Sequence, residues 1–150
     1  MILGVLGWFK FQSRSVLAIE GLRFDLPNGW NLDRLEKSSN KAGTWSVAWI
    51  KVPDPKYQVK IPFQVSTSND PLDKDKRTLL KETSSGAKIY DEGCAPAIAC
   101  YELIFKGVRY EVSFGEPKSN QDAPKDLDGP WFPDTTVTEE DTLNFLATVR

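Results

Sequence analysis

The 150-residue sequence contains no histidine, only two cysteines, and no run of four or more basic residues. Histidine is the commonest general base and metal ligand, so its absence excludes Ser-His-Asp sites, Cys-His sites and zinc sites that use imidazole. Two cysteines cannot supply a four-thiolate zinc site. No GxxxxGK[ST] or GxGxxG phosphate loop occurs either. These absences predict a protein that is not an enzyme and that holds no metal and no cofactor.

The charge of the chain is also low and evenly spread. The formal net charge is −2, the isoelectric point is near 5.2, and the lysines and arginines are scattered. Nucleic-acid-binding domains show a basic patch or stripe, which predicts that nucleic acid is not a partner. The apolar stretch Met1 to Phe9 is far shorter than the roughly 20 residues of a membrane span, so we expect no stable span in this chain.

Residues 1–18 differ in character from the rest of the chain. Lys10 and Arg14 follow the apolar part, whereas a secretory signal carries its positive charge before it. Val16-Leu17-Ala18 nevertheless fits a small-x-small cleavage pattern. Residues 1–18 are therefore either an extension that is the remnant of a signal segment or a native first strand or amphipathic segment. Residues 19–150 have the length of a single domain.

The segment Tyr101 to Phe114 has the pattern of a β-hairpin. Lys106-Gly107 fits the two central turn positions, where glycine readily adopts positive φ. This turn places Phe105 opposite Val108, Leu103 opposite Tyr110 and Tyr101 opposite Val112, all on one face. The opposite face then carries Glu102 and Glu111 directly across from each other. A shift of one residue would bury the charges, so the pattern specifies the register strongly.

Further strands are predicted where apolar residues alternate along the chain. These segments are residues 22–26, 44–52, 57–65 and 87–90. Trp45, Val47 and Trp49 share one face of the second segment, and we expect that face to be core. Pro62 cannot donate a ladder hydrogen bond, so the third segment is expected at a sheet edge or at a bulge. Residues 33–43 are polar and indicate a loop.

Two helices are predicted. Asn69-Asp70-Pro71 has the composition of a helix start, and Ser84-Ser85-Gly86 that of a helix end. The second helix runs from Thr138 to Arg150, with Thr138 and Asp141 as a capping pair. Together these segments predict an α+β fold, an antiparallel sheet of about six strands with two helices packed on it.

The order of elements and the opening residues resemble the PsbP-like α/β sandwich superfamily. The resemblance covers residues 19–150 and is carried by Phe24, Leu26, Pro27, Gly29 and Trp30, followed by a C-terminal helix rich in leucine and phenylalanine. The superfamily includes thylakoid lumen PsbP, DcrB-type bacterial envelope proteins, a Ran-binding import factor and chaperones for type VI secretion effectors. The resemblance implies helices on the faces of an antiparallel sheet, and binding rather than catalysis. Pro53-Asp54-Pro55 and the cysteine pair depart from the pattern.

Cys94 and Cys100 bound the segment CAPAIAC just before the hairpin. A structural disulfide between them would imply an oxidising compartment. The alternative is two unlinked cysteines that are buried as small apolar residues.

The long segment 115–134 contains the candidate partner-binding residues. Trp131 and Phe132 form an aromatic pair between two prolines, with Asp128 close by, and exposed aromatic anchors are frequent in interfaces. The same aromatic pair could instead plug the end of the sheet. The aspartates of this segment do not match the spacing of a calcium-binding EF-hand loop, which agrees with the expectation of no metal.

Two functions remain open from the sequence. The first is a non-enzymatic binding or accessory protein of the bacterial envelope, placed outside the cytoplasm in a periplasm or lumen, that contacts a protein partner. The second is a cytoplasmic chaperone or adaptor that holds apolar segments of a client on a sheet face. An enzyme that uses only carboxylates, such as Glu102 with Glu111, is the weakest alternative. The sequence does not indicate the oligomeric state.

Overall fold

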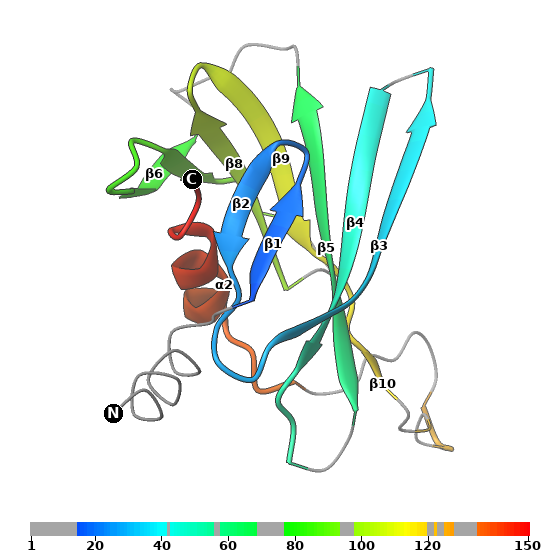
Figure 1. Ribbon diagram of the computed structural model, residues 1–150. Helices are drawn as coiled ribbons and strands as arrows, with labels where there is room; N and C mark the ends of the chain where they lie inside the picture. The colour runs from blue at the N-terminus through cyan, green and yellow to red at the C-terminus, as the bar shows by residue number, and fades with distance from the viewer. Residues whose placement is uncertain are drawn as a thin grey trace, which may run out of the picture.

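The described part of the chain forms an antiparallel β-sheet, a separate β-hairpin and one α-helix (Figure 1). The computed structural model describes residues 15–41, 43–55, 58–68, 77–93, 98–119, 122, 125–127 and 135–150, with only the backbone of Asn40 and Gly43. Eight strands pair in the order β3-β4-β5-β9-β8-β7-β6, with β10 added beside β5. The hairpin pairs β1 with β2.

The elements follow one another along the chain in numbered order, although β5 and β9 are adjacent in the sheet and not in the chain. They are β1 Val16–Ile19, β2 Leu22–Asp25, β3 Asn31–Asn40, β4 Gly43–Val52, β5 Val59–Ser68, β6 Thr78–Glu82, β7 Lys88–Asp91, β8 Ala99–Phe105, β9 Val108–Phe114, β10 Lys118–Ser119 and α2 Glu139–Leu146.

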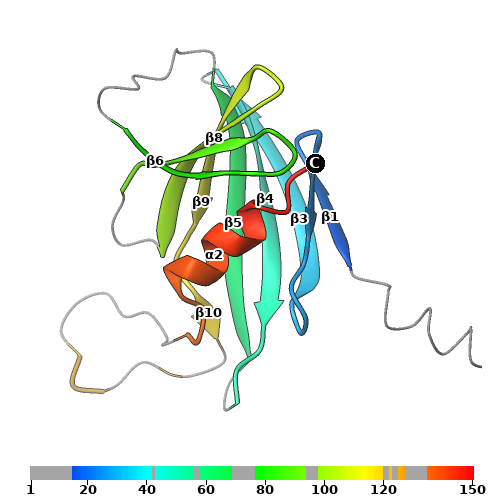
Figure 2. The ribbon, with the colours of Figure 1, turned by 90° about the vertical axis from the view of Figure 1, so that its left-hand side faces the viewer.

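The helix and the β1–β2 hairpin lie on the same side of the sheet (Figures 1 and 2). We refer to the side of the sheet that they cover as the core face and to the opposite side as the outer face. In Figure 2, α2 lies across the middle strands, and β6 curves in front of the same face. The Ser85 hydroxyl, in the β6–β7 turn, donates to the Val149 carbonyl at 2.6 Å. This contact links the curled end of the sheet to the chain segment that follows α2.

The core between these layers is centred on Phe145 of α2, which is 1% exposed. Its ring stacks on Phe24 at a centroid distance of 5.1 Å and meets Phe63 edge to face at 5.2 Å. Trp30 and Phe114 complete the cluster, each at 5.8 Å. Helix, hairpin and sheet therefore meet at a single aromatic side chain, and such pairs add about 0.5–1.5 kcal/mol each beyond area burial.

The predicted hairpin 101–114 is confirmed, including its register. Phe105 pairs with Val108, Leu103 with Tyr110, and Tyr101 with Val112. Lys106 and Gly107 have φ values of 50° and 77° at the turn. The predicted capping pair at the C-terminal helix is also confirmed, because Thr138 and Asp141 form a reciprocal capping box.

The predicted fold class is wrong. The described residues hold ten strands and one eight-residue helix, so the fold is mostly β rather than six strands with two helices. The predicted helix 69–86 contains β6, Thr78–Glu82, while residues 69–76 lie outside the described part of the chain. The predicted loop 33–43 contains most of β3. Both strands are exposed sheet edges, where no buried face imposes alternation on the sequence.

The predicted core face of β4 is also wrong. Ser46, Ala48 and Ile50 are buried, while Trp45 and Trp49 are half-buried on the outer face. Apolar residues lie on both faces of this strand, so the sequence pattern alone does not show which face is buried. The small side chain of Ser46 lies below the β1–β2 turn and donates a hydrogen bond to the Glu20 carboxylate. Ser46 and Ala48 thus occupy the core face of β4 near the hairpin, and the tryptophans lie on the outer face.

Pro62 lies in a central strand, not at an edge, because β5 pairs with β4 on one side and with β9 and β10 on the other. The ladder between β5 and β9 ends at Phe63 opposite Phe114, and the Gly115 N–H donates to the Pro62 carbonyl at 2.9 Å. The missing N–H of Pro62 therefore falls in the interval between β9 and β10, where it breaks no ladder hydrogen bond.

At the N-terminal side, β1 includes the tripeptide that fits a cleavage pattern. Val16 and Ala18 are exposed, Leu17 is 1% exposed in the core, and all three pair with β2. Residues 1–14 lie outside the described part of the chain.

Candidate functional site

The outer face of the sheet carries the concentration of polar and charged side chains that we consider the candidate site. A row of directly opposed residues crosses four strands there, from Glu102 on β8 to Glu111 on β9, Ser66 on β5 and Trp45 on β4. Neither α2 nor the β1–β2 hairpin covers these residues (Figures 1 and 2). The outer face is thus a surface of mixed aromatic, hydroxyl and acidic chemistry.

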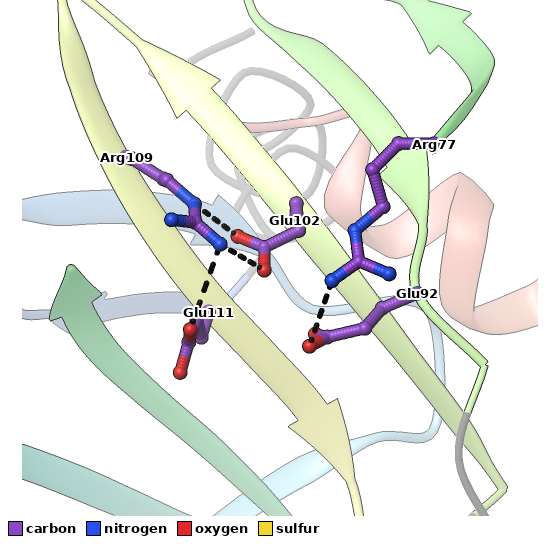
Figure 3. A network of polar contacts seen from close by, with 5 residues as sticks. All are labelled: Arg77, Glu92, Glu102, Arg109 and Glu111. Carbon is purple, nitrogen blue, oxygen red and sulfur yellow. Dashed lines mark hydrogen bonds and ion pairs between the residues drawn. The ribbon is translucent and has the colours of Figure 1, made fainter. Parts of the chain in front are cut away.

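The Glu102–Arg109 ion pair is the centre of this site (Figure 3). Glu102 is 0% exposed, and both of its carboxylate oxygens accept from Arg109, Oε2 from Nε at 2.8 Å and Oε1 from Nη2 at 2.7 Å. This bidentate contact holds the pKa of Arg109 above its ordinary value. The sequence interpretation placed Glu102 on an exposed face without burial, and that was wrong.

Glu92, directly after β7, and Glu111, on β9, flank the ion pair (Figure 3). One carboxylate oxygen from each of Glu92, Glu102 and Glu111 lies within 4.8 Å of the others. Arg109 Nη2 is 3.7 Å from Glu111, and Arg77 Nη2 is 3.6 Å from Glu92. Two guanidinium groups therefore face three carboxylates, so the cluster carries one net negative charge when all five groups are ionised. Because both oxygens of Glu102 already accept from Arg109, the cluster is arranged for arginine rather than for a metal ion.

Partial burial raises the pKa of Glu92 above its ordinary value of 4.5, and the charges of Glu102 and Glu111 raise it further. The folded state thus favours protonated Glu92 more than the unfolded state does. The associated stability is present below pH 4.5 and is lost as pH rises through the folded-state pKa.

Glu92→Gln should therefore remove this component of the pH dependence. We expect the variant to gain stability relative to the wild type as pH rises from 4.5 toward neutrality. Urea unfolding of both proteins across this range measures the difference. A constant difference at all pH values would contradict the assignment of raised pKa to Glu92.

A shallow hollow of about 210 Å³ adjoins the cluster on the outer face. The residues that line it, among those described, are Gln64, Ser66, Glu92, Gly93, Cys100, Glu111, Val112 and Ser113. Sites that enclose a drug-sized ligand measure roughly 300–1,000 Å³, so the hollow is small for such a ligand. It has the size of a recess for one or two side chains of another molecule.

The end of the outer face near β10 has the opposite charge. Lys60 donates to Asp33 at 3.0 Å, Lys51 lies 3.5 Å from the same carboxylate, and these contacts hold the pKa of Asp33 below its ordinary value. Lys60 and Lys118 also line a second hollow of about 250 Å³. The outer face therefore runs from a basic end, through the tryptophans of β4, to an acidic cluster on β8, on β9 and directly after β7.

The residues selected from the sequence are only partly within this site. Glu102 and Glu111 face each other as predicted, and Cys100 lies half-buried on β8 opposite Ser113. Cys94, Asp128, Trp131 and Phe132 lie outside the described part of the chain, so the disulfide and the aromatic anchor stay predictions.

Sequence reasoning missed Glu92 and Arg77 as members of the site. Both lie just outside short strands, and the curl of the sheet brings them to Glu102. The signal that was available is the pair of opposed glutamates itself, since like charges across a ladder need a cation nearby.

Comparisons with known protein families, with curated proteins and with solved structures find no match to this chain. They neither support nor contradict the resemblance to the PsbP-like superfamily. Within the described residues, no helix is both long and apolar enough to span a membrane.

Proposed function

We propose that this chain is a non-enzymatic binding protein that engages a protein partner through the outer face of its sheet. The observation that carries the proposal is the outer face, which neither α2 nor the β1–β2 hairpin covers, with Trp45, Gln64, Ser66 and Ser113 beside the acidic cluster. Polar groups around a few aromatic side chains are typical of transient interfaces. The partner surface should present basic groups to the acidic cluster and acidic groups to Lys60 and Lys118.

The charged cluster supports binding better than catalysis. A catalytic carboxylate needs a free proton-transfer position that can reach a substrate. Both oxygens of Glu102, the one fully buried carboxylate among the described residues, accept from Arg109. The arrangement therefore favours a rigid, charged surface over an acid-base pair.

The alternative of a chaperone for apolar client segments has less support. It calls for an exposed apolar groove, whereas hydroxyl, amide and carboxylate side chains line the hollow beside the cluster. A location in the bacterial envelope, outside the cytoplasm, rests on the predicted disulfide between Cys94 and Cys100. The intact mass of the protein after thiol alkylation in the source cells measures that state directly.

Gln64→Arg should weaken partner binding strongly without unfolding the protein. Gln64 is exposed, lines the hollow and opposes Ser113, so a large cation there blocks the recess. We expect the variant to recover at least about tenfold less partner, the effect of about 1.4 kcal/mol. Quantitative co-purification from the source cells measures this, with circular dichroism to confirm folding.

Lys81→Glu is the matched control, because Lys81 is exposed on β6 at the far edge of the sheet. It should recover the partner at the wild-type level. Equal recovery by Gln64→Arg and Lys81→Glu would exclude the outer face. If deletion of residues 118–130 and Trp131→Ala also leave recovery unchanged, the 115–134 segment is excluded as well.

A further inference from the structure

Among the described strands, the edge strand β3 pairs on one side only. It ends the strand order, and every described side chain from Asn31 to Ser39 is exposed. Asn40 and Gly43 close a two-residue turn, so Arg34, Glu36 and Ser38 direct their backbone groups toward β4. The residues between them, including Leu35 and Lys37, direct their backbone N–H and C=O groups to the free edge. Such an edge is a template for another strand.

The side chains of this edge are amphipathic and carry both charges. Arg34 and Glu36 lie on the outer face, opposite Trp49 and Val47, and form an ion pair of 2.8 Å that is more than half exposed. Leu35 lies on the core face opposite Ala48 and is 49% exposed. The core face therefore continues to the edge with an uncovered leucine.

We propose that β3 pairs antiparallel with β3 of a second copy of this chain, with the two-fold axis at Leu35. In this register Leu35 faces Leu35 of the second copy across the axis. Arg34 faces Glu36 of the second copy, and Glu36 faces its Arg34, all on the outer face. Opposite charges directly across a ladder stabilise it, and two such pairs arise from one symmetric contact.

The charges of β3 select this register over its neighbours. A two-fold axis at Arg34, Glu36 or Lys37 places like charges directly opposite each other, which is destabilising. The bulge between Leu32 and Arg34 and the alternating charges also deter a foreign strand. The charge pattern of β3 is therefore complementary to itself in an antiparallel pair. The strand that fits this edge is β3 of a second copy of the chain.

The paired sheets present both outer faces on the same side. Two candidate binding surfaces would then act together, and a partner with two matching surfaces would gain avidity without new contacts. The pairing does not depend on the proposed function, because β3 and the hollow are separate parts of the molecule.

Sedimentation velocity of the full chain over a range of protein concentrations tests the pairing. The wild type should reach the mass of two 16.9-kDa chains. Arg34→Glu and Glu36→Arg should each weaken the dimer at least about tenfold, since each creates like-charge pairs across the axis. An equimolar mixture of the two variants should restore a dimer, because acidic and basic edges then face each other. Lys81→Glu on β6 is the control and should dimerise as the wild type does.

Each outcome supports or overturns the proposal. Restoration by mixing supports it, since no folding defect is repaired by a second defective variant. A wild type that stays monomeric at all concentrations overturns it and leaves the edge to a strand of another protein. A dimer that persists in both single variants overturns it as well, because the contact then lies elsewhere.

Discussion

Glu102→Gln should destabilise the protein by about 3 kcal/mol, because loss of one partner leaves the other charge of a largely buried pair uncompensated. Glutamine has the shape of glutamate but cannot neutralise Arg109, whose side chain is only 14% exposed. Glu111 lies 3.7 Å from the same guanidinium and can compensate in part, which keeps the expected loss near the lower end of the usual range. Urea unfolding at pH 7 measures the change.

Two further variants separate the charge from the shape of this site. Glu111→Gln should change stability by less than about 0.5 kcal/mol, because that side chain is 48% exposed. The double variant Glu102→Leu with Arg109→Met should recover most of the loss, since apolar residues of similar volume can replace a buried ion pair. A neutral effect of Glu102→Gln would show that Glu102 is not buried as a charged group.

Phe145→Ala should destabilise the protein by about 4 kcal/mol, which is a large fraction of the stability of a typical domain. The ring contacts four aromatic side chains from β2, β5, β9 and the β2–β3 connection. Its removal leaves a cavity where helix, hairpin and sheet meet. Thermal unfolding followed by circular dichroism should show a strongly lowered Tm or an unfolded chain at room temperature.

Asn144→Ala is the matched control on the same helix, because Asn144 is exposed. It should change stability by less than about 0.5 kcal/mol. Phe145→Leu should fall between the two, since it leaves a smaller cavity. Equal effects of Phe145→Ala and Asn144→Ala would mean that α2 does not dock on the sheet through Phe145.

The β8–β9 hairpin was predictable because its information is local. One turn with Lys106-Gly107 and one buried face define the pairing of all seven positions from Phe105 and Val108 outward. The capping box at Thr138 is local in the same sense. Each depends on residues that are close in sequence, so the physical chemistry of a short segment was sufficient.

The edge strands were not predictable, because their stability comes from the sheet. The segment Asn31–Asn40 is mostly polar and its two leucines, Leu32 and Leu35, are exposed, while Thr78–Glu82 has no buried side chain. Neither segment has the alternation that reports a buried face, and backbone pairing with β4 or β7 makes each a strand. Leu79 and Leu80, which lie in the segment predicted to be a helix, are exposed on an edge strand.

Only the part of the candidate site that depends on local sequence was predictable. The opposition of Glu102 and Glu111 follows from the hairpin register alone. The burial of Glu102 depends on its tertiary surroundings, including Tyr90 on the neighbouring strand, and these come from elsewhere in the chain. A sequence pattern reports which side chains share a face, but not what else lies against that face.

The most direct test of the binding surface is photo-crosslinking in the source cells with a photoreactive amino acid placed at Gln64. The same group placed at Lys81 on β6 is the reference position. The outer-face account predicts a discrete crosslinked protein from Gln64, absent from Lys81 and lost in the presence of Ser113→Arg, which fills the hollow. Equal crosslinking from both positions, or none from Gln64, would contradict it.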